Sequence, residues 1–389
     1  MTLKILNDDG TVINHTINKK ANNSNNEIQL IHSSSKEQNA LKIIEGYYSN
    51  KKSILYDDTN KDITTELKDL SIFENQDFSM MFFTSGSTGN PVGALKTKSN
   101  LEEEVKVFTK LIKEYNIKQV IVTVPFVHIY GTLVALLYPL LNDLDIILKE
   151  HFLPYNLIEV IEENSLIVTT PLYIKALNKV SDNVDLNSSL FVSSTAPLDG
   201  SSSKEFCKKF NTNLIQLFGS TETSGIAYKK NDEQLWTPLE KVDISVNDED
   251  ELKVSSPFVS NTLYNNGFQN INGSFQTFDY IEQHKNKFKL VGRSSKIFKI
   301  AGKRYSTIQV ENILEDINEV NKALVFVKNC ENNIRDEILD ITLESKKEFS
   351  SLEIKNILKS KLSNLKFSIN LHYVDKISTN AIGKKLILN

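Results

Sequence analysis

Short apolar runs alternate with amphipathic stretches between residues 80 and 219. The apolar runs predict strands at residues 80–83, 119–126, 166–169, 190–194 and 213–218. Apolar side chains at helical spacing begin at Leu101 and continue through Val105 and Phe108. Ser99 and Glu102 have the spacing of a capping box, which predicts that this helix starts beside them. The alternation favours βαβ units around a parallel sheet that helices cover on both faces.

After residue 242 the pattern changes to alternating strands, with a predicted hairpin at residues 275–280 and 287–291. Residues 293–303 are dense in serine and basic side chains and mark the expected domain junction. The remaining periodicity predicts helices at residues 307–317 and 350–365, and strands at 323–327, 338–343 and 369–374. Before residue 80 the pattern shows only isolated strand-like pieces at 2–6 and 53–56.

These elements predict an α/β protein of two domains. The expected N-terminal domain, residues 1–293, holds the parallel-sheet βαβ layers and a small β-rich subdomain. The expected C-terminal domain, residues 294–389, is a small α+β domain. The length of 389 residues is sufficient for two such cores.

Composition excludes several classes of function. The net charge of −4 gives no electrostatic footprint for nucleic acid or for an anionic membrane. No apolar run is long enough to span a bilayer, and the first ten residues lack the apolar core of a signal peptide. Two cysteines fit a reducing cytoplasm, and the six scattered histidines lack the spacing of zinc ligands. We therefore expect a cytoplasmic protein without membrane insertion or nucleic-acid partners.

A glycine-rich loop, residues 84–93, follows the first clear strand and reads Thr-Ser-Gly-Ser-Thr-Gly-Asn-Pro-Val-Gly. Glycines bring backbone N–H groups close to an anion, and hydroxyl groups add donors to phosphate oxygens. The loop is not a Walker A loop, and it lacks the Gly-x-Gly-x-x-Gly of a dinucleotide site. A phosphate-binding loop is one interpretation, and a flexible strand-to-helix turn is the other.

The loop resembles the phosphate-binding motif of the adenylate-forming superfamily, which includes acyl-CoA synthetases, peptide-synthetase adenylation domains and luciferases. The residues that match are Thr84, Ser85, Gly86, Ser87, Thr88 and Gly89. Val92 departs from the motif, because the family usually has a lysine there. The resemblance extends over residues 80–389 and implies a shortened first subdomain before it.

Residues 216–222, Gln-Leu-Phe-Gly-Ser-Thr-Glu, are similar to a second family motif. The resemblance implies that Phe218 stacks on the purine and that Gly219 also contacts the nucleotide. It further implies that Thr221 contacts the α-phosphate, and that Glu222 and Thr84 bind Mg²⁺. The alternative is that Thr221 and Glu222 form the first turn of a capped helix.

Further motifs follow in family order. Residues 193–198 resemble a strand end that contacts the nucleotide through Thr195, Ala196 and Pro197. Asp279 stands where the family's aspartate binds the ribose, with Phe278 in place of glycine; a solvated hairpin aspartate is the alternative. Residues 292–311 resemble the hinge motif, and the roles implied there belong to Arg293 (ribose), Ser295 (hinge), Lys299 (acyl pocket), Gly302 (thiol tunnel) and the motif's closing Glu311.

The last motif ends at Lys384, which the resemblance makes the lysine that bridges acid and α-phosphate during adenylation. Ser378 replaces the proline that usually opens this motif, and a solvated tail is the alternative. Residues 124–131 resemble the segment before the acyl pocket, so His128 and Tyr130 are its candidate walls. For His128, a packing or capping role is equally open.

The resemblance implies a ligase that uses ATP and Mg²⁺ to join a carboxylic acid to AMP, releasing pyrophosphate. It also implies that the C-terminal domain, residues 294–389, is a mobile lid that rotates about the hinge. The acyl group is then transferred to a thiol, from CoA or from the phosphopantetheine of an acyl carrier protein. The mixed pocket candidates favour an aryl or medium-length acyl substrate. A catalytically weakened homologue that binds only nucleotide or a partner is one alternative, and a kinase or ATPase is another.

Overall fold

The computed structural model describes residues 1–19, 27–32, 35–57, 63–64, 67–84, 92–180, 184–293, 297–300, 303–329, 337–362, 368–378 and 385. Side chains at 297–306, 308–309, 328–329 and 337 lie outside this description. The chain forms two compact units, Met1–Ile244 with Lys253–Phe275, and Ser245–Leu252 with Gln276–Asn389. The domain boundary expected between residues 293 and 294 stays a prediction.

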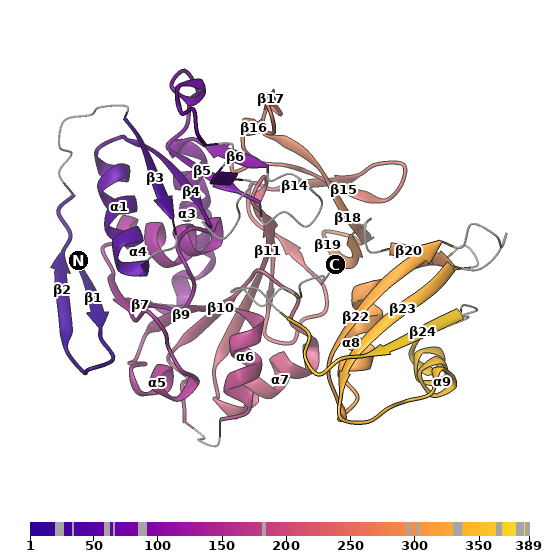
Figure 1. Cartoon of the computed structure of the whole chain (residues 1–389). Helices are drawn as coiled ribbons and strands as arrows, with labels where there is room; N and C mark the ends of the chain where they lie inside the picture. The colour runs from indigo at the N-terminus through magenta and orange to yellow at the C-terminus, as the bar shows by residue number, and fades with distance from the viewer. Residues whose placement is uncertain are drawn as a thin grey trace. The chain divides into compact units, whose positions relative to one another are not determined.

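The first unit is built on a mixed sheet of nine strands among its described residues (Figure 1). The strands are β1 Thr2–Leu6, β2 Val12–Thr16, β7 Gln119–Val122, β8 Asp145–Leu148, β9 Ser165–Thr169, β10 Leu190–Ser193, β11 Asn213–Ser220, β12 Ser224–Lys230 and β13 Thr237–Pro238. Their order is β13-β12-β11-β10-β9-β7-β8-β1-β2, parallel from β11 to β1 and antiparallel at the outer strands. The predicted parallel sheet is confirmed.

A second sheet in this unit has the order β17-β16-β6-β5-β4-β3. Its strands are β3 Ile28–His32, β4 Lys52–Tyr56, β5 Met80–Phe83, β6 Gly93–Lys96, β16 Thr262–Tyr264 and β17 Phe268–Asn270. The strand predicted at residues 80–83 therefore belongs to this sheet, next to the early strand-like piece near residue 53. The β5 and β6 strands pair antiparallel across the glycine-rich loop.

Helices cover both faces of the nine-stranded sheet, as the alternation predicts. The helical elements of this unit are α1 Lys36–Tyr48, η1 Ser71–Phe73, α3 Lys98–Leu111, η2 Lys113–Tyr115, the π-helical turn η3 Gly131–Leu137, α4 Tyr138–Leu141, α5 Pro154–Glu159, α6 Pro171–Asn178 and α7 Gly200–Lys209. Val120 and Val122 pack into the core with α1 and α3, whereas Ile121 points to the opposite core with α6 and α7. This period of two explains why β7 is apolar on both faces.

Two predicted boundaries in this unit are wrong. The α3 helix is capped by Thr97, whose side chain accepts from Asn100 N while the Asn100 side chain accepts from Thr97 N. The predicted capping residue Ser99 is inside the helix, and the Glu102 carboxylate instead accepts from Tyr47 Oη at 2.7 Å. The strand predicted at residues 119–126 ends at Val122, because a turn begins before the next helix.

The second unit contains most of a hairpin, β18 Ser274–His284 with β19 Lys287–Arg293, from a four-stranded sheet of order β14-β15-β18-β19. The other strands are β14 Asp243–Val246 and β15 Glu251–Ser255, and a short hairpin β20 Ile297–Ile300 with β21 Lys303–Ser306 follows. A three-stranded sheet of β22 Val320–Asn329, β23 Glu337–Ser345 and β24 Ser368–Tyr373 packs against α8 Thr307–Glu315 and α9 Ser351–Lys361. The capping box of Ser350 and Glu353 is confirmed.

Candidate functional site

A pair of residues closes the base of the glycine-rich loop. Thr84 follows β5, and Val92 precedes β6. Thr84 N donates to Val92 O at 2.9 Å, and Val92 N donates to Thr84 Oγ1 at 3.1 Å. The strand-loop-strand geometry at this base contradicts a direct strand-to-helix turn. Residues 85–91 lie outside the described part of the chain, so phosphate binding by Ser85 to Gly89 stays a prediction.

A β-bulge shapes the end of β11. The register between β11 and β12 shifts between Phe218 and Gly219. A Cβ atom on Gly219 would lie 2.1 Å from Ser224 O, so a side chain here would push the two strands apart. The Phe218 ring lies against Trp236 with centroids 5.4 Å apart, so one aromatic partner for this ring already comes from the protein.

The chain turns back immediately after this bulge. Ser220 N donates to Thr223 Oγ1 at 3.1 Å, and Thr223 N donates to Ser220 Oγ at 3.2 Å. The reciprocal bonds close a turn whose two central residues are Thr221 and Glu222, and β12 follows. The alternative that these residues begin a capped helix is therefore wrong. Both side chains are partly exposed at the tip of a turn.

Lys96 donates a hydrogen bond to the main chain of this turn. Its side chain is fully buried at the end of β6, and Nζ donates to Glu222 O at 2.9 Å and to Phe258 O at 2.8 Å. Burial lowers the pKa of Lys96, and the carboxylates of Glu104 and Glu222 oppose that shift without cancelling it. The sequence analysis missed both Lys96 and the short strand that carries it.

Glu104 is a second buried charge that the sequence analysis missed. It lies in α3, and its Oε1 accepts from Gly225 N at 2.8 Å. Burial raises the pKa of Glu104, while the Lys96 ammonium and the Gly225 N–H group favour the ionised form. One signal was available: Glu104 is three residues after Leu101 and four before Phe108, and therefore lies on the apolar face of the predicted helix.

The strand end at residues 193–198 has strained backbone and unpaired hydroxyl groups. Thr195 has φ = +82°, an unfavourable conformation for a β-branched residue and one that clusters at functional sites. Ser193 Oγ and Thr195 Oγ1 are buried and have no hydrogen-bond partner within the described structure. Ala196 and Pro197 follow, the first partly exposed and the second exposed. Buried hydroxyl groups without a partner are uncommon in native structures, so they are consistent with a functional role for this strand end.

Tyr130 is placed by two strands of the parallel sheet. Its hydroxyl lies 3.0 Å from Thr169 O and 2.7 Å from Val192 O, at the ends of β9 and β10. Burial raises the pKa of Tyr130 well above its usual range. The Tyr130 hydroxyl group thus bonds to the ends of two neighbouring strands. Only the ring of Tyr130 could therefore line a pocket. His128 is half-buried, and its main-chain oxygen accepts from Thr132 N at 3.0 Å.

In the second unit, Asp279 and Arg293 face each other across the hairpin β18–β19. Their Cα positions are partners in the register, and Arg293 Nε lies 3.0 Å from Asp279 Oδ1. The Asp279 side chain is 5% exposed and that of Arg293 is 42% exposed. Asp279 is therefore buried and paired, which contradicts the alternative of a solvated aspartate. Phe278, the departure beside it, is 61% exposed.

The second unit also brings the hinge motif's Glu311 to the C-terminal motif. Glu311 is 5% exposed; its Oε1 accepts from Val325 N at 3.0 Å, and its Oε2 lies 2.8 Å from Lys385 Nζ. Lys384 itself, Ser295 and Gly302 lie outside the described residues, as does the side chain of Lys299. Their predicted roles stay predictions.

Within the described residues, no group of three or more His, Cys, Asp or Glu side chains could hold a metal ion. A catalytic Mg²⁺ does not need such a cluster, because it is usually bound by one or two carboxylates together with substrate phosphates. Glu222, half-buried on a turn with a fixed main chain, fits that requirement.

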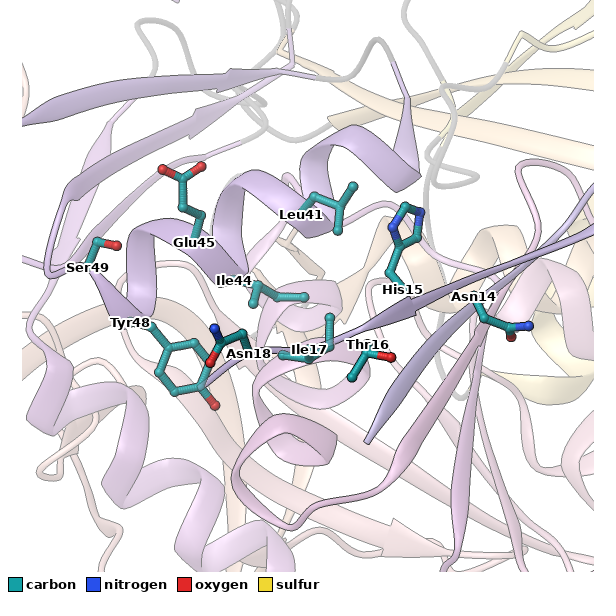
Figure 2. A pocket seen from close by; sticks show the side chains of 10 residues that line it. All are labelled: Asn14, His15, Thr16, Ile17, Asn18, Leu41, Ile44, Glu45, Tyr48 and Ser49. Carbon is teal, nitrogen blue, oxygen red and sulfur yellow. The ribbon is translucent and has the colours of Figure 1, made fainter. Parts of the chain in front are cut away.

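A groove of about 420 Å³ lies elsewhere in the first unit, between β2 and α1 (Figure 2). Its lining includes His15, Ile17, Ile44 and Tyr48. His15 Nε2 lies 2.7 Å from Glu37 Oε1. None of the residues that line the groove is a predicted site residue, so the groove is separate from the nucleotide and acyl contacts inferred above.

The family model described as "AMP-binding enzyme" matches residues 5–270. The chain belongs to this family. It is thus an adenylate-forming ligase, as the order of the motifs predicts, and the predicted superfamily is confirmed. The match includes the residues before position 80, where the sequence analysis found no resemblance.

Named relatives agree with this membership. VraA of Staphylococcus aureus (strain COL), provisionally named a long chain fatty acid-CoA ligase, is 26% identical over 320 residues, covering 78% of this chain and 68% of VraA. The ATP-bound MatB of Rhodopseudomonas palustris shares the fold, with a TM-score of 0.79, 14% identity, and coverage of 99% of this chain and 94% of MatB. The o-succinylbenzoate coenzyme A synthetase (MenE) of Bacillus subtilis, in complex with ATP and magnesium ion, also shares the fold. Its TM-score is 0.78 and its identity 16%, and the match covers 98% of this chain and 95% of MenE.

Among the described residues, no helix has the length and apolar character needed to cross a membrane.

Proposed function

We propose that this ligase activates a carboxylic acid with ATP and Mg²⁺ as an acyl adenylate, and then transfers the acyl group to a thiol. The observation that carries the proposal is the link between two motif segments: Lys96, on the strand that leaves the glycine-rich loop, binds the main chain of Glu222. Two segments expected to contact the phosphates are therefore joined within one compact unit, as a phosphate site requires.

The chemistry follows from the poor leaving group of a carboxylate, which is oxide. Attack of the acid on the α-phosphate forms a bond to AMP and breaks the bond to pyrophosphate. The protein has to position the reactants and neutralise charge. In this proposal Thr221 and Lys384 contact the α-phosphate, and the loop from Thr84 to Gly89 holds the β- and γ-phosphates. Mg²⁺ held by Glu222 would neutralise charge on the phosphate oxygens.

The remaining predicted contacts complete the site. Thr195, Ala196, Pro197, Phe218 and Gly219 take the adenine side, and Asp279 with Arg293 takes the ribose. His128, Tyr130 and Lys299 line the acyl pocket, while Gly302 lines the thiol tunnel and Ser295 is the hinge. The hydroxyl groups of Ser193 and Thr195, buried and without a partner among the described residues, support a functional contact at the adenine side.

The proposed acid is an aryl or medium-length acyl compound, and the proposed acceptor is CoA or a carrier-protein phosphopantetheine. Similar proteins are named for a long-chain fatty acid and for o-succinylbenzoate, so both apolar and aryl acids belong in the test. A cytoplasmic location, expected from the two cysteines, stays a prediction.

The test is pyrophosphate release from ATP and Mg²⁺ with a panel of aryl, medium-chain and long-chain acids, followed by addition of CoA or a phosphopantetheinylated carrier. We expect acid-dependent pyrophosphate with AMP as the nucleotide product. ATP binding without pyrophosphate release for any acid would favour the weakened homologue, for which Val92, Phe278, Ser295 and Ser378 are the relevant departures. ADP as the product would instead indicate phosphoryl transfer.

A further inference from the structure

Lys96 is a charged residue in a fully buried strand. All four residues of β6 are buried, and the Lys96 side chain has no exposed surface. Burying a cation is unfavourable unless protein groups replace its water shell. Two main-chain oxygens do so here, Glu222 O at 2.9 Å and Phe258 O at 2.8 Å. The position therefore has a specific polar function, which an apolar side chain could not perform.

The two oxygens belong to segments that also contact each other. Glu222 O accepts a second hydrogen bond from Ser260 N at 3.0 Å, and Ser260 is two residues after Phe258. Lys96 thus clamps the turn at Glu222 to the loop at residues 256–260. Since the Glu222 carbonyl has both of its acceptor sites used, the backbone beneath the Glu222 carboxylate has little freedom to rotate.

Glu104 binds the strand that follows the same turn. It accepts from Gly225 N at 2.8 Å, three residues after Glu222, and its charge attracts the Lys96 ammonium. A Cβ atom on Gly225 would lie 2.9 Å from Glu104 Oε1, so glycine leaves room for the carboxylate. A buried lysine and a buried glutamate therefore bind the main chain at Glu222 and at Gly225, three residues later.

We propose that Lys96 is a positioning residue of the nucleotide site, fixing the turn that presents Glu222 relative to the strand that leaves the glycine-rich loop, with Glu104 as its buried counter-charge. This inference rests on the proposed function of Glu222 in holding Mg·ATP. Lys96 acts through the main chain of Glu222 and contacts neither substrate nor metal.

The test compares Lys96→Met with the double variant Lys96→Met/Glu104→Gln. The single variant leaves the Glu104 carboxylate buried without its counter-charge, so reduced stability is expected. The double variant removes that charge and recovers stability. In both variants the Glu222 carbonyl loses its cationic donor, so we expect the Kd for Mg·ATP and the Mg²⁺ concentration for half-maximal activity to rise by about tenfold or more.

Lys209→Met is the matched control. Lys209 is also a lysine of the first unit that donates to main-chain oxygens, those of Leu177 at 3.4 Å and Asn178 at 2.8 Å, but it holds the end of α6. It should lose stability without a change in Mg·ATP affinity. This control separates general loss of a lysine-to-carbonyl clamp from loss of the clamp at Glu222.

Calorimetric Mg·ATP binding needs no acid, so it also separates this inference from the proposed function. If the wild-type chain binds Mg·ATP but turns over no acid, the proposed reaction fails while the comparison of affinities still applies. Wild-type affinity and Mg²⁺ dependence in folded Lys96→Met would overturn the positioning role. Recovery of both stability and affinity in the double variant would also overturn it, because Lys96 would then serve only to balance Glu104.

Discussion

Glu311 and Lys385 are 74 positions apart in the sequence, and Glu311 Oε2 lies 2.8 Å from Lys385 Nζ. Glu315 Oε1 also lies 2.6 Å from this ammonium, and Ala323 O accepts from it at 2.6 Å. Lys385 is thereby anchored to α8 and β22 of the second unit. In the sequence, Lys385 directly follows Lys384, the predicted adenylation lysine.

We predict that Lys385→Met destabilises the second unit by about 3 kcal/mol, since it leaves two carboxylates at a mostly buried position without their cation. Urea unfolding, followed by a probe in the second unit, measures the change. Lys376→Met, at an exposed position, is the control and should unfold like the wild type. An equal unfolding free energy in Lys385→Met and wild type would contradict the anchor.

The same cluster predicts a dependence on alkaline pH. Burial alone would lower the pKa of Lys385, but Glu311 and Glu315 outweigh it and raise the pKa above its usual value of 10.5. The folded state therefore binds this proton more tightly than the unfolded state does. The resulting stabilisation is complete below pH 10.5 and disappears as pH rises through the folded-state pKa. Urea unfolding across this range should show a steeper loss of stability in wild type than in Lys385→Met.

Lys384→Ala should abolish acid-dependent pyrophosphate release, because the proposed bridging cation at the α-phosphate is removed. Thiol attack on a chemically prepared acyl adenylate should remain largely intact. The two half-reactions are measured separately, with Lys376→Ala as the control. Equal loss of both half-reactions would count against the assigned role.

Glu222→Gln should weaken Mg·ATP-dependent adenylation, since an amide is a poorer Mg²⁺ ligand than a carboxylate. We expect the Mg²⁺ concentration for half-maximal pyrophosphate release to rise about tenfold or more. Glu240→Gln, an exposed carboxylate of the same unit, should leave it unchanged. Identical Mg²⁺ titrations for wild type and Glu222→Gln would remove Glu222 from the metal site.

Gly219→Ala should lower stability by about 1–3 kcal/mol, because its Cβ would lie 2.1 Å from the main-chain oxygen of Ser224 and the bulge would have to open. The Kd for Mg·ATP should rise with it, since Glu222 lies in the turn that this bulge begins. Gly200→Ala is the control, where the new Cβ would meet only the end of the Gln234 side chain at 3.0 Å. Calorimetry and thermal unfolding of both variants test the expectation.

Local signals were sufficient for much of the fold. The strand at residues 80–83 and the Ser350 cap were predicted at their observed positions, because a short continuous apolar run and capping chemistry both depend on near neighbours. For the segment at Thr221 and Glu222, the sequence allowed two interpretations, a helix start and a strand end. Only the pairing of β11 with β12 decided it, and that pairing depends on a bulge at Gly219.

The sequence by itself determined the family, the alternation of strands and helices, and the order of the motifs, since these depend on residue types at fixed spacing. The tertiary structure alone decided that Lys96 is buried, and which main-chain groups Lys96 and Glu104 bind. Lys96 and Glu104 are ordinary charged residues in the sequence, and nothing local shows that they meet the main chain beside Glu222. Long-range packing removes these two side chains from water. Their burial is then tolerated only because a few protein groups replace the lost water contacts.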